Sequence, residues 1–107
     1  MIQVYNPYDE KLVGEVPVLD GRQVKEAMDR GARVFADRAK WLNISQRVEI
    51  LEQFRKLVIA NQEKLIQQAL AEGGKPLVDT KVEVARAIDG IRVAIENIPH
   101  LLGREIP

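Results

Sequence analysis

The stretch PLVDTKVEVARAIDGIRVAIENIPHLL, at residues 76–102 of the 107-residue chain, decides the fold. Six large apolar residues recur in it at spacings of four, three, four, three and four: Val84, Ile88, Ile91, Ile95, Ile98 and Leu102. This period places all six side chains on one face of a helix. Because an interior proline breaks or kinks a helix, Pro99 predicts a regular helix over about residues 76–98, with a bend before Gly103.

Two roles are open to this apolar face. It is either the core face of a packed helix or a surface for self-association, since its spacing also suits helix pairing. About two and a half heptads are present and the flanking charges are irregular, which favours a core or domain contact.

Three earlier segments show the same helical period, and we expect helices over about residues 20–37, 45–60 and 61–72. Asp20 and Ser45 are predicted to be their N-caps, because their side chains can accept hydrogen bonds from free backbone N–H groups of the first turn.

Different residue types mark the two ends of the third helix and the start of the last one. Asn61 either caps that helix or interrupts a continuous one. Gly73-Gly74 predicts its C-terminal end, since glycine adopts the left-handed conformation without a Cβ clash. Pro76 suits the first turn of the last helix, where its missing N–H costs nothing.

Residues 2–17 are predicted to form a β-hairpin. β-Branched and apolar residues flank a turn sequence at Asn6–Lys11, and Pro17 ends the second strand. The fold class is therefore mainly α, with a short N-terminal β-hairpin followed by about four amphipathic helices packed as a bundle. We find no repeat, linker or domain boundary, so residues 1–107 are expected to form a single domain.

The composition excludes several function classes. Sixteen basic and sixteen acidic residues give zero formal charge, so we expect neither nucleic acid nor a membrane as partner. No apolar run is long enough to span a bilayer, and Met1–Pro7 has no secretory pattern. The chain has no cysteine and a single histidine, His100, which excludes a thiolate nucleophile and disfavours histidine metal clusters.

No motif in the chain predicts a catalytic or cofactor-binding residue. Gly73-Gly74-Lys75 fails the phosphate-loop pattern, because that pattern needs glycine where Ala69 stands and Ser or Thr where Pro76 stands. The carboxylates of residues 49, 52, 83 and 89 are predicted to be solvated helix-face residues. Trp41 and Phe54 are expected to be core anchors.

A series of short motifs runs the length of the chain: Val4-Tyr5-Asn6-Pro7, Gly14-Glu15-Val16-Pro17, Val24 through Phe35, Trp41-Leu42 with Ser45-Gln46-Arg47, Ile50-Leu51, Glu72-Gly73-Gly74-Lys75-Pro76-Leu77, Val82-Glu83-Val84 and Gly103-Arg104-Glu105-Ile106-Pro107. Each is weak alone, but their shared order and spacing are specific. In this respect the chain resembles the N-terminal segment of the NAD(P)-dependent aldehyde dehydrogenase family, and the resemblance covers essentially all of it.

The resemblance implies a fragmentary or truncated relative of an α/β enzyme that oxidises an aldehyde to a carboxylic acid. The family's nucleophilic cysteine, general-base glutamate, oxyanion-hole asparagine and nucleotide-binding glycines have no counterpart here. The family uses NAD or NADP, but we expect no cofactor to bind this chain alone, and no activity from it. The expected partners are the remainder of such an enzyme or further copies of the chain, in the cytoplasm. A non-enzymatic helical module for interaction or oligomerisation is the alternative.

The resemblance also implies roles for four residues. A monovalent cation is held in several family members by oxygens at positions that match the Val4 carbonyl and the Glu72 carboxylate, with further ligands beyond Pro107. The start of the last helix borders the family's substrate entrance, which implies that Glu83 and Arg86 lie near it. Pro99 departs from many relatives.

Overall fold

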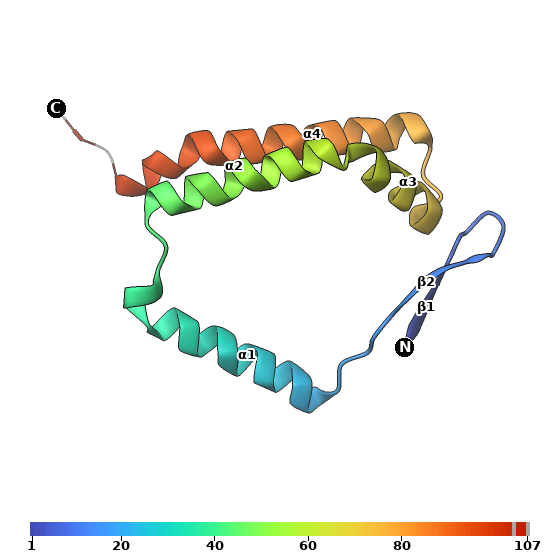
Figure 1. The fold of residues 1–107 in the computed structure, drawn as a ribbon, viewed down its shortest axis with the longest axis horizontal. Helices are drawn as coiled ribbons and strands as arrows, with labels where there is room; N and C mark the ends of the chain where they lie inside the picture. The colour runs from blue at the N-terminus through green and yellow to red at the C-terminus, as the bar shows by residue number, and fades with distance from the viewer. Residues whose placement is uncertain (104, 107) are drawn as a thin grey trace.

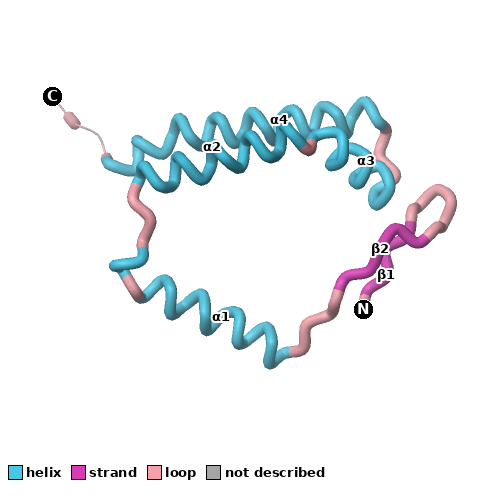
Figure 2. Tube along the Cα trace, viewed as in Figure 1, coloured by secondary structure: helices cyan, strands magenta, loops and turns pink. Residues whose placement is uncertain are grey.

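The computed structural model describes residues 1–103, 105 and 106, and helices dominate it (Figures 1 and 2). The elements in chain order are β1 (Ile2–Tyr5), β2 (Leu12–Val16), α1 (Gly21–Ala36), the 3-10 turn η1 (Arg38–Lys40), α2 (Ile44–Ala60), α3 (Gln62–Gly73), α4 (Leu77–Asn97) and the 3-10 turn η2 (Ile98–Leu102). The prediction of a mainly α chain with an N-terminal hairpin and four helices is confirmed. Arg104 and Pro107 of the closing sequence motif lie outside the described residues.

The hairpin pairs β1 antiparallel to β2, with a bulge between Val4 and Tyr5. Asn6 organises the turn between the strands. Its side-chain Oδ1 accepts a hydrogen bond from the Tyr8 amide at 2.8 Å, and its own amide donates to the Lys11 carbonyl at 2.9 Å. An asparagine at the start of such a turn substitutes a side-chain acceptor for a backbone one, so the turn is locally encoded.

Capping boxes start α1 and α2. Asp20 accepts from the Gln23 amide at 2.8 Å while the Gln23 side chain accepts from the Asp20 amide at 2.9 Å, which confirms Asp20 as the N-cap. The same reciprocal pair joins Asn43 and Gln46 at the start of α2. The prediction that Ser45 caps this helix is wrong, because Asn43 has a partner of the right type three residues later.

Asn61 separates α2 from α3. Its Nδ2 donates a hydrogen bond to the Leu57 carbonyl at 2.8 Å, near the C-terminal end of α2. The Asn61 side chain provides no cap for α3. At the other end of α3, Gly74 is left-handed with φ 61°, as predicted for a C-terminal stop. Pro76 is the N-cap of α4 and not its first residue. η2, which contains Pro99, begins where α4 ends, so the expected break is present.

Three of the four helices form the expected bundle. α4 packs along α2 and α3, and its apolar face is half-buried from Val84 to Ile98. α1 has its main contacts with η1 and lies apart from the other helices (Figure 1). Apolar residues on α1 therefore face solvent, and Met28 is 70% exposed. α1 therefore lies outside the three-helix bundle, and apolar side chains of α2 such as Ile50 and Leu57 are exposed as well.

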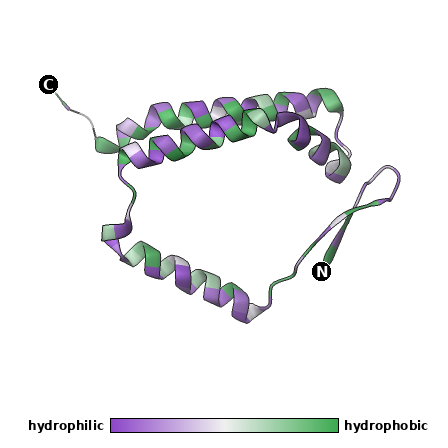
Figure 3. Cartoon of the chain, in the orientation of Figure 1, coloured by the Kyte–Doolittle hydropathy of each residue, from purple (hydrophilic) through white to green (hydrophobic). Residues whose placement is uncertain are grey.

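The chain is far more open than a compact domain of its length. Its radius of gyration is 19.0 Å, where about 13 Å is expected for a compact chain of this length. Its accessible surface is 8893 Å², where a compact protein of this mass exposes about 6,000 Å². Among the described residues, Ile66 is the single large apolar side chain that is fully buried. Figure 3 shows apolar residues along every helix of this open arrangement.

The prediction that Trp41 and Phe54 anchor a core is wrong. Trp41 is 39% exposed and Phe54 is 50% exposed. The Trp41 ring packs against Phe35 and Arg38, which are close to it in sequence, and half of the Phe54 side chain is exposed. Within the described residues, no helix is both long and apolar enough to cross a membrane.

Candidate functional site

The junction between the hairpin and α3 brings together the elements that carry Val4 and Glu72. β1 contacts α3, and the backbone of Gly74 lies directly against the ring of Pro7. Val4 is half-buried in β1 beside the bulge, and the Glu72 carboxylate accepts a hydrogen bond from the Gln68 side-chain amide. The sequence-predicted pair therefore comes from two elements in contact, although 68 residues of sequence separate them.

The donor chemistry at this junction is all oxygen. A backbone carbonyl and a carboxylate are the ligand types that hard cations prefer. Among the described residues, no three His, Asp or Glu side chains gather in a way that could hold a metal ion. The Val4 carbonyl and the Glu72 carboxylate therefore stay predicted ligands of a hard monovalent cation.

Glu83 and Arg86 lie three residues apart on the first half of α4. Both side chains are exposed, and the Glu83 carboxylate forms an ion pair with the Lys75 ammonium group, which precedes the helix. Three residues are close to one helical turn, so the two side chains leave the same side of α4. The structure brings neither of them near Val4 or Glu72 in any described contact.

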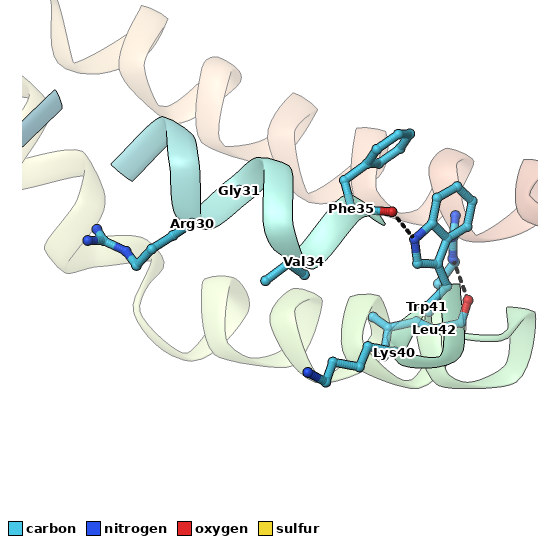
Figure 4. A pocket seen from close by; sticks show the side chains of 8 residues that line it. Arg30, Gly31, Val34, Phe35, Lys40, Trp41 and Leu42 are labelled. Carbon is cyan, nitrogen blue, oxygen red and sulfur yellow. Dashed lines mark hydrogen bonds between the residues drawn. The ribbon is translucent and has the colours of Figure 1, made fainter. Parts of the chain in front are cut away.

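An open groove lies where α1, η1 and the start of α2 meet (Figure 4). Its volume is about 980 Å³. We call it the Trp41 groove, and its lining residues are Arg30, Gly31, Val34, Phe35, Lys40, Trp41, Leu42 and Arg47. Sequence reasoning missed it. The one available signal was the chain's single tryptophan, placed in a connector and not on a helical stripe.

Local contacts hold the aromatic wall of this groove. The Trp41 Nε1–H donates to the Phe35 carbonyl at 3.0 Å, and the two ring centroids are 5.1 Å apart. The Arg38 guanidinium lies 4.0 Å from the Trp41 ring centroid, a cation–π distance. Arg47 donates through Nε to the Leu42 carbonyl at 3.0 Å (Figure 4). The wall is therefore fixed in position while its outer faces stay accessible.

A charge cluster on α4 consists of Asp89, Arg92 and Glu96. Arg92 donates to Asp89 at 2.8 Å and to Glu96 at 2.5 Å. The hydrogen bond from Arg92 and its charge hold the pKa of the Asp89 carboxyl below its ordinary value, and the charge of Arg55 on α2 adds to this effect.

Replacing Asp89 should make stability less dependent on pH. The folded-state pKa of Asp89 is depressed, so its contribution is fully present well above the unfolded pKa of about 3.9 and disappears as pH falls through the folded value. Asp89→Asn should therefore be less stable than the parent chain at neutral pH and equal to it in acid. Urea midpoints measured across the acid range test this, and a constant gap between the two chains would contradict it.

Comparison of the sequence with known proteins shows the family to which the chain belongs. The family model described as "Aldehyde dehydrogenase family" matches residues 1–107. Among curated proteins, the chain is 27% identical to the malonate-semialdehyde dehydrogenase of Bacillus pumilus, over 97% of this chain and 21% of that protein. It is 32% identical to the N-succinylglutamate 5-semialdehyde dehydrogenase of Vibrio cholerae, over 98% and 21% respectively. It is 31% identical to the glutarate-semialdehyde dehydrogenase of Pseudomonas putida, over 99% and 22%.

The chain spans about a fifth of the length of these relatives. No solved structure matches it significantly. The family match nevertheless covers every residue of the chain. The chain therefore belongs to the aldehyde dehydrogenase family, of which it represents an N-terminal segment.

Proposed function

We propose that the chain is the N-terminal part of an NAD(P)-dependent aldehyde dehydrogenase that converts an aldehyde to a carboxylic acid. The observation that carries the proposal is the openness of a chain whose whole length matches this family. Helices with uncovered apolar faces are what the outer layer of a larger enzyme leaves when the layer beneath it is absent.

The chemistry must come from the remainder of the enzyme. Aldehyde oxidation by a covalent route needs a thiolate that adds to the carbonyl carbon, after which a hydride leaves to the nicotinamide ring. The chain contains no cysteine and no glycine-rich nucleotide motif. It therefore has no activity alone, and NAD or NADP is held by the remainder.

In this proposal, four residues of the chain have roles outside the catalytic centre. The Val4 carbonyl and the Glu72 carboxylate supply two oxygens to a monovalent cation site, supported by the contact of β1 with α3. Glu83 and Arg86 lie at the rim of the substrate entrance, supported by their exposure on one side of α4. We assign the protein to the cytoplasm, as its resemblance to the aldehyde dehydrogenase family implies. The absence of cysteine is compatible with that reducing compartment.

Complementation tests the proposed function. The chain is co-expressed with the P. putida glutarate-semialdehyde dehydrogenase from which the matching N-terminal segment has been deleted. We expect production of NADH or NADPH that depends on glutarate semialdehyde and on both polypeptides. The rate should exceed that of either polypeptide alone by at least about 100-fold, because a nucleophile and a covered cofactor site are both required.

Two controls accompany the assay. The relative's own deleted segment, supplied as a separate chain, shows that the split is tolerated. With that control active, inactivity of the mixture counts against the proposal. Aldehyde-dependent NADH production by the purified 107-residue chain, free of other enzymes, would overturn it outright.

A second candidate function is a non-enzymatic module that self-associates. The observation that favours it is the accessible surface, which exceeds that of a compact protein of this mass by about 2,900 Å². In that case the chain should form a stable oligomer whether or not it complements a dehydrogenase.

A further inference from the structure

The Trp41 groove combines an apolar floor with a cationic rim. Val34, Phe35, Trp41 and Leu42 supply the floor, and Arg30, Lys40 and Arg47 supply the charges, with no acidic side chain among the lining residues. Lys40 is paired with Asp37 at 3.0 Å, whereas Arg30 has no ion pair within the described residues. In a chain of zero net charge, this segregation selects an acidic, apolar occupant.

The open arrangement of the whole chain, and not the groove alone, leaves surface free for a second copy. The surplus of about 2,900 Å² per copy exceeds the roughly 1,000 Å² that each partner contributes to a stable homodimer. Two grooves cannot meet face to face, because their cationic rims would repel each other. A second copy must therefore present a different surface to the groove.

The tip of the hairpin has the complementary chemistry. Tyr8 is 95% exposed, and Asp9 and Glu10 follow it directly. The Asp9 carboxylate pairs with the Lys11 ammonium group at 2.8 Å, so Glu10 supplies the negative charge of the tip that a partner can meet. The turn is rigid, since Asn6 Oδ1 accepts from the Tyr8 amide at 2.8 Å and the Glu10 amide donates to the Asn6 carbonyl at 2.9 Å. An exposed tyrosine on a rigid turn loses little conformational entropy on binding, which suits an interface anchor.

We propose that two copies of the chain pair reciprocally, with the Tyr8–Glu10 tip of each copy seated in the Trp41 groove of the other. The tyrosine ring lies against the Trp41 and Phe35 floor, and the Glu10 carboxylate faces the cationic rim. The tip and the groove lie toward opposite ends of the molecule in Figure 1, so an antiparallel pair satisfies both contacts at once and closes as a dimer.

This pairing concerns the 107-residue chain by itself, and it rests on the second candidate function and not on the proposed dehydrogenase role. In an assembled dehydrogenase the same apolar floor is available to the remainder of the enzyme. Dimerisation and complementation are measured separately, so either can fail while the other holds.

The test uses Trp41 as a reporter, because it is the only tryptophan of the chain and it lines the groove. Sedimentation velocity and Trp41 emission are followed from micromolar to submillimolar concentration. We expect one dimer transition in both readouts, weaker at high salt because exposed charges are screened. Tyr8→Ala, Glu10→Lys and Arg30→Glu should each raise the dimer Kd by about tenfold or more.

A charge exchange makes the assignment specific. A dimer of Glu10→Lys with Arg30→Glu has two complementary contacts, one with the charges exchanged and one native, so the mixture should dimerise more tightly than either variant alone, by about tenfold or more. Lys56→Glu reverses a charge at an exposed position of α2 that does not line the groove, and it should leave the Kd unchanged. Far-ultraviolet circular dichroism confirms that each variant is folded. A parent chain that is monomeric throughout, a dimer insensitive to Tyr8→Ala, or a mixture without recovery would each overturn the proposal.

Discussion

Gly74→Ala should detach the hairpin from α3 and destabilise the chain by about 3 kcal/mol. A Cβ at this position would lie 2.5 Å from Pro7 Cγ, a distance at which the proline ring or the backbone must move. Gly74 also has φ 61°, which costs a non-glycine residue about 1–2 kcal/mol, and overpacking adds about 1–3 kcal/mol. Urea unfolding followed by circular dichroism measures the loss, and faster amide exchange in β1 reports the detachment.

The neighbouring glycine is the matched control. Gly73 is the last residue of α3, and a Cβ there meets nothing within 4 Å. Gly73→Ala should therefore be neutral or stabilising by up to about 1 kcal/mol, since alanine favours the helix. Equal effects of the two substitutions would show that the contact with Pro7 does not hold the hairpin.

Ile66→Ala should be comparably destabilising, by about 3 kcal/mol. Ile66 is 5% exposed on the inner face of α3, and removing a buried isoleucine side chain loses transfer free energy and leaves a cavity. In so open a chain this loss is a large part of the total stability. Thermal and urea unfolding should both shift, and the helical signal at 37 °C should fall.

Leu65→Ala provides the comparison at the adjacent position. Leu65 is 43% exposed, so its truncation should cost about 1 kcal/mol in the isolated chain. If the two variants were equally destabilised, α3 would not pack through Ile66 as described.

The elements of the fold follow from local sequence, and their arrangement does not. Asp20 with Gln23, the Gly74 stop and Pro99 each act through neighbours in sequence, so the helix boundaries could be predicted to within a residue or two. Ser45 was the wrong cap because serine and asparagine both suit the role, and the Gln46 partner decides between them. The position of α1 could not be predicted, because its apolar face indicates that something covers it without indicating what.

The candidate site, too, could be predicted from the sequence only in part. Val4 and Glu72 were paired by resemblance, and no sequence periodicity relates a strand to a helix end 68 residues later. Their two elements are in contact, and Pro7 lies against Gly74 at the same junction. The Trp41 groove was missed because its wall is built from the end of one helix, a 3-10 turn and the start of the next. Only three-dimensional packing places these pieces together.

The reciprocal caps at Asp20–Gln23 and Asn43–Gln46 have a consequence for biosynthesis. Each start signal is complete within four residues, so the first residue of α1 and of α2 is set without a distant contact. A nascent chain therefore presents these helices with their start points already defined, while most of their stability awaits packing against another surface. A partner that docks later completes helices whose start points need no further search.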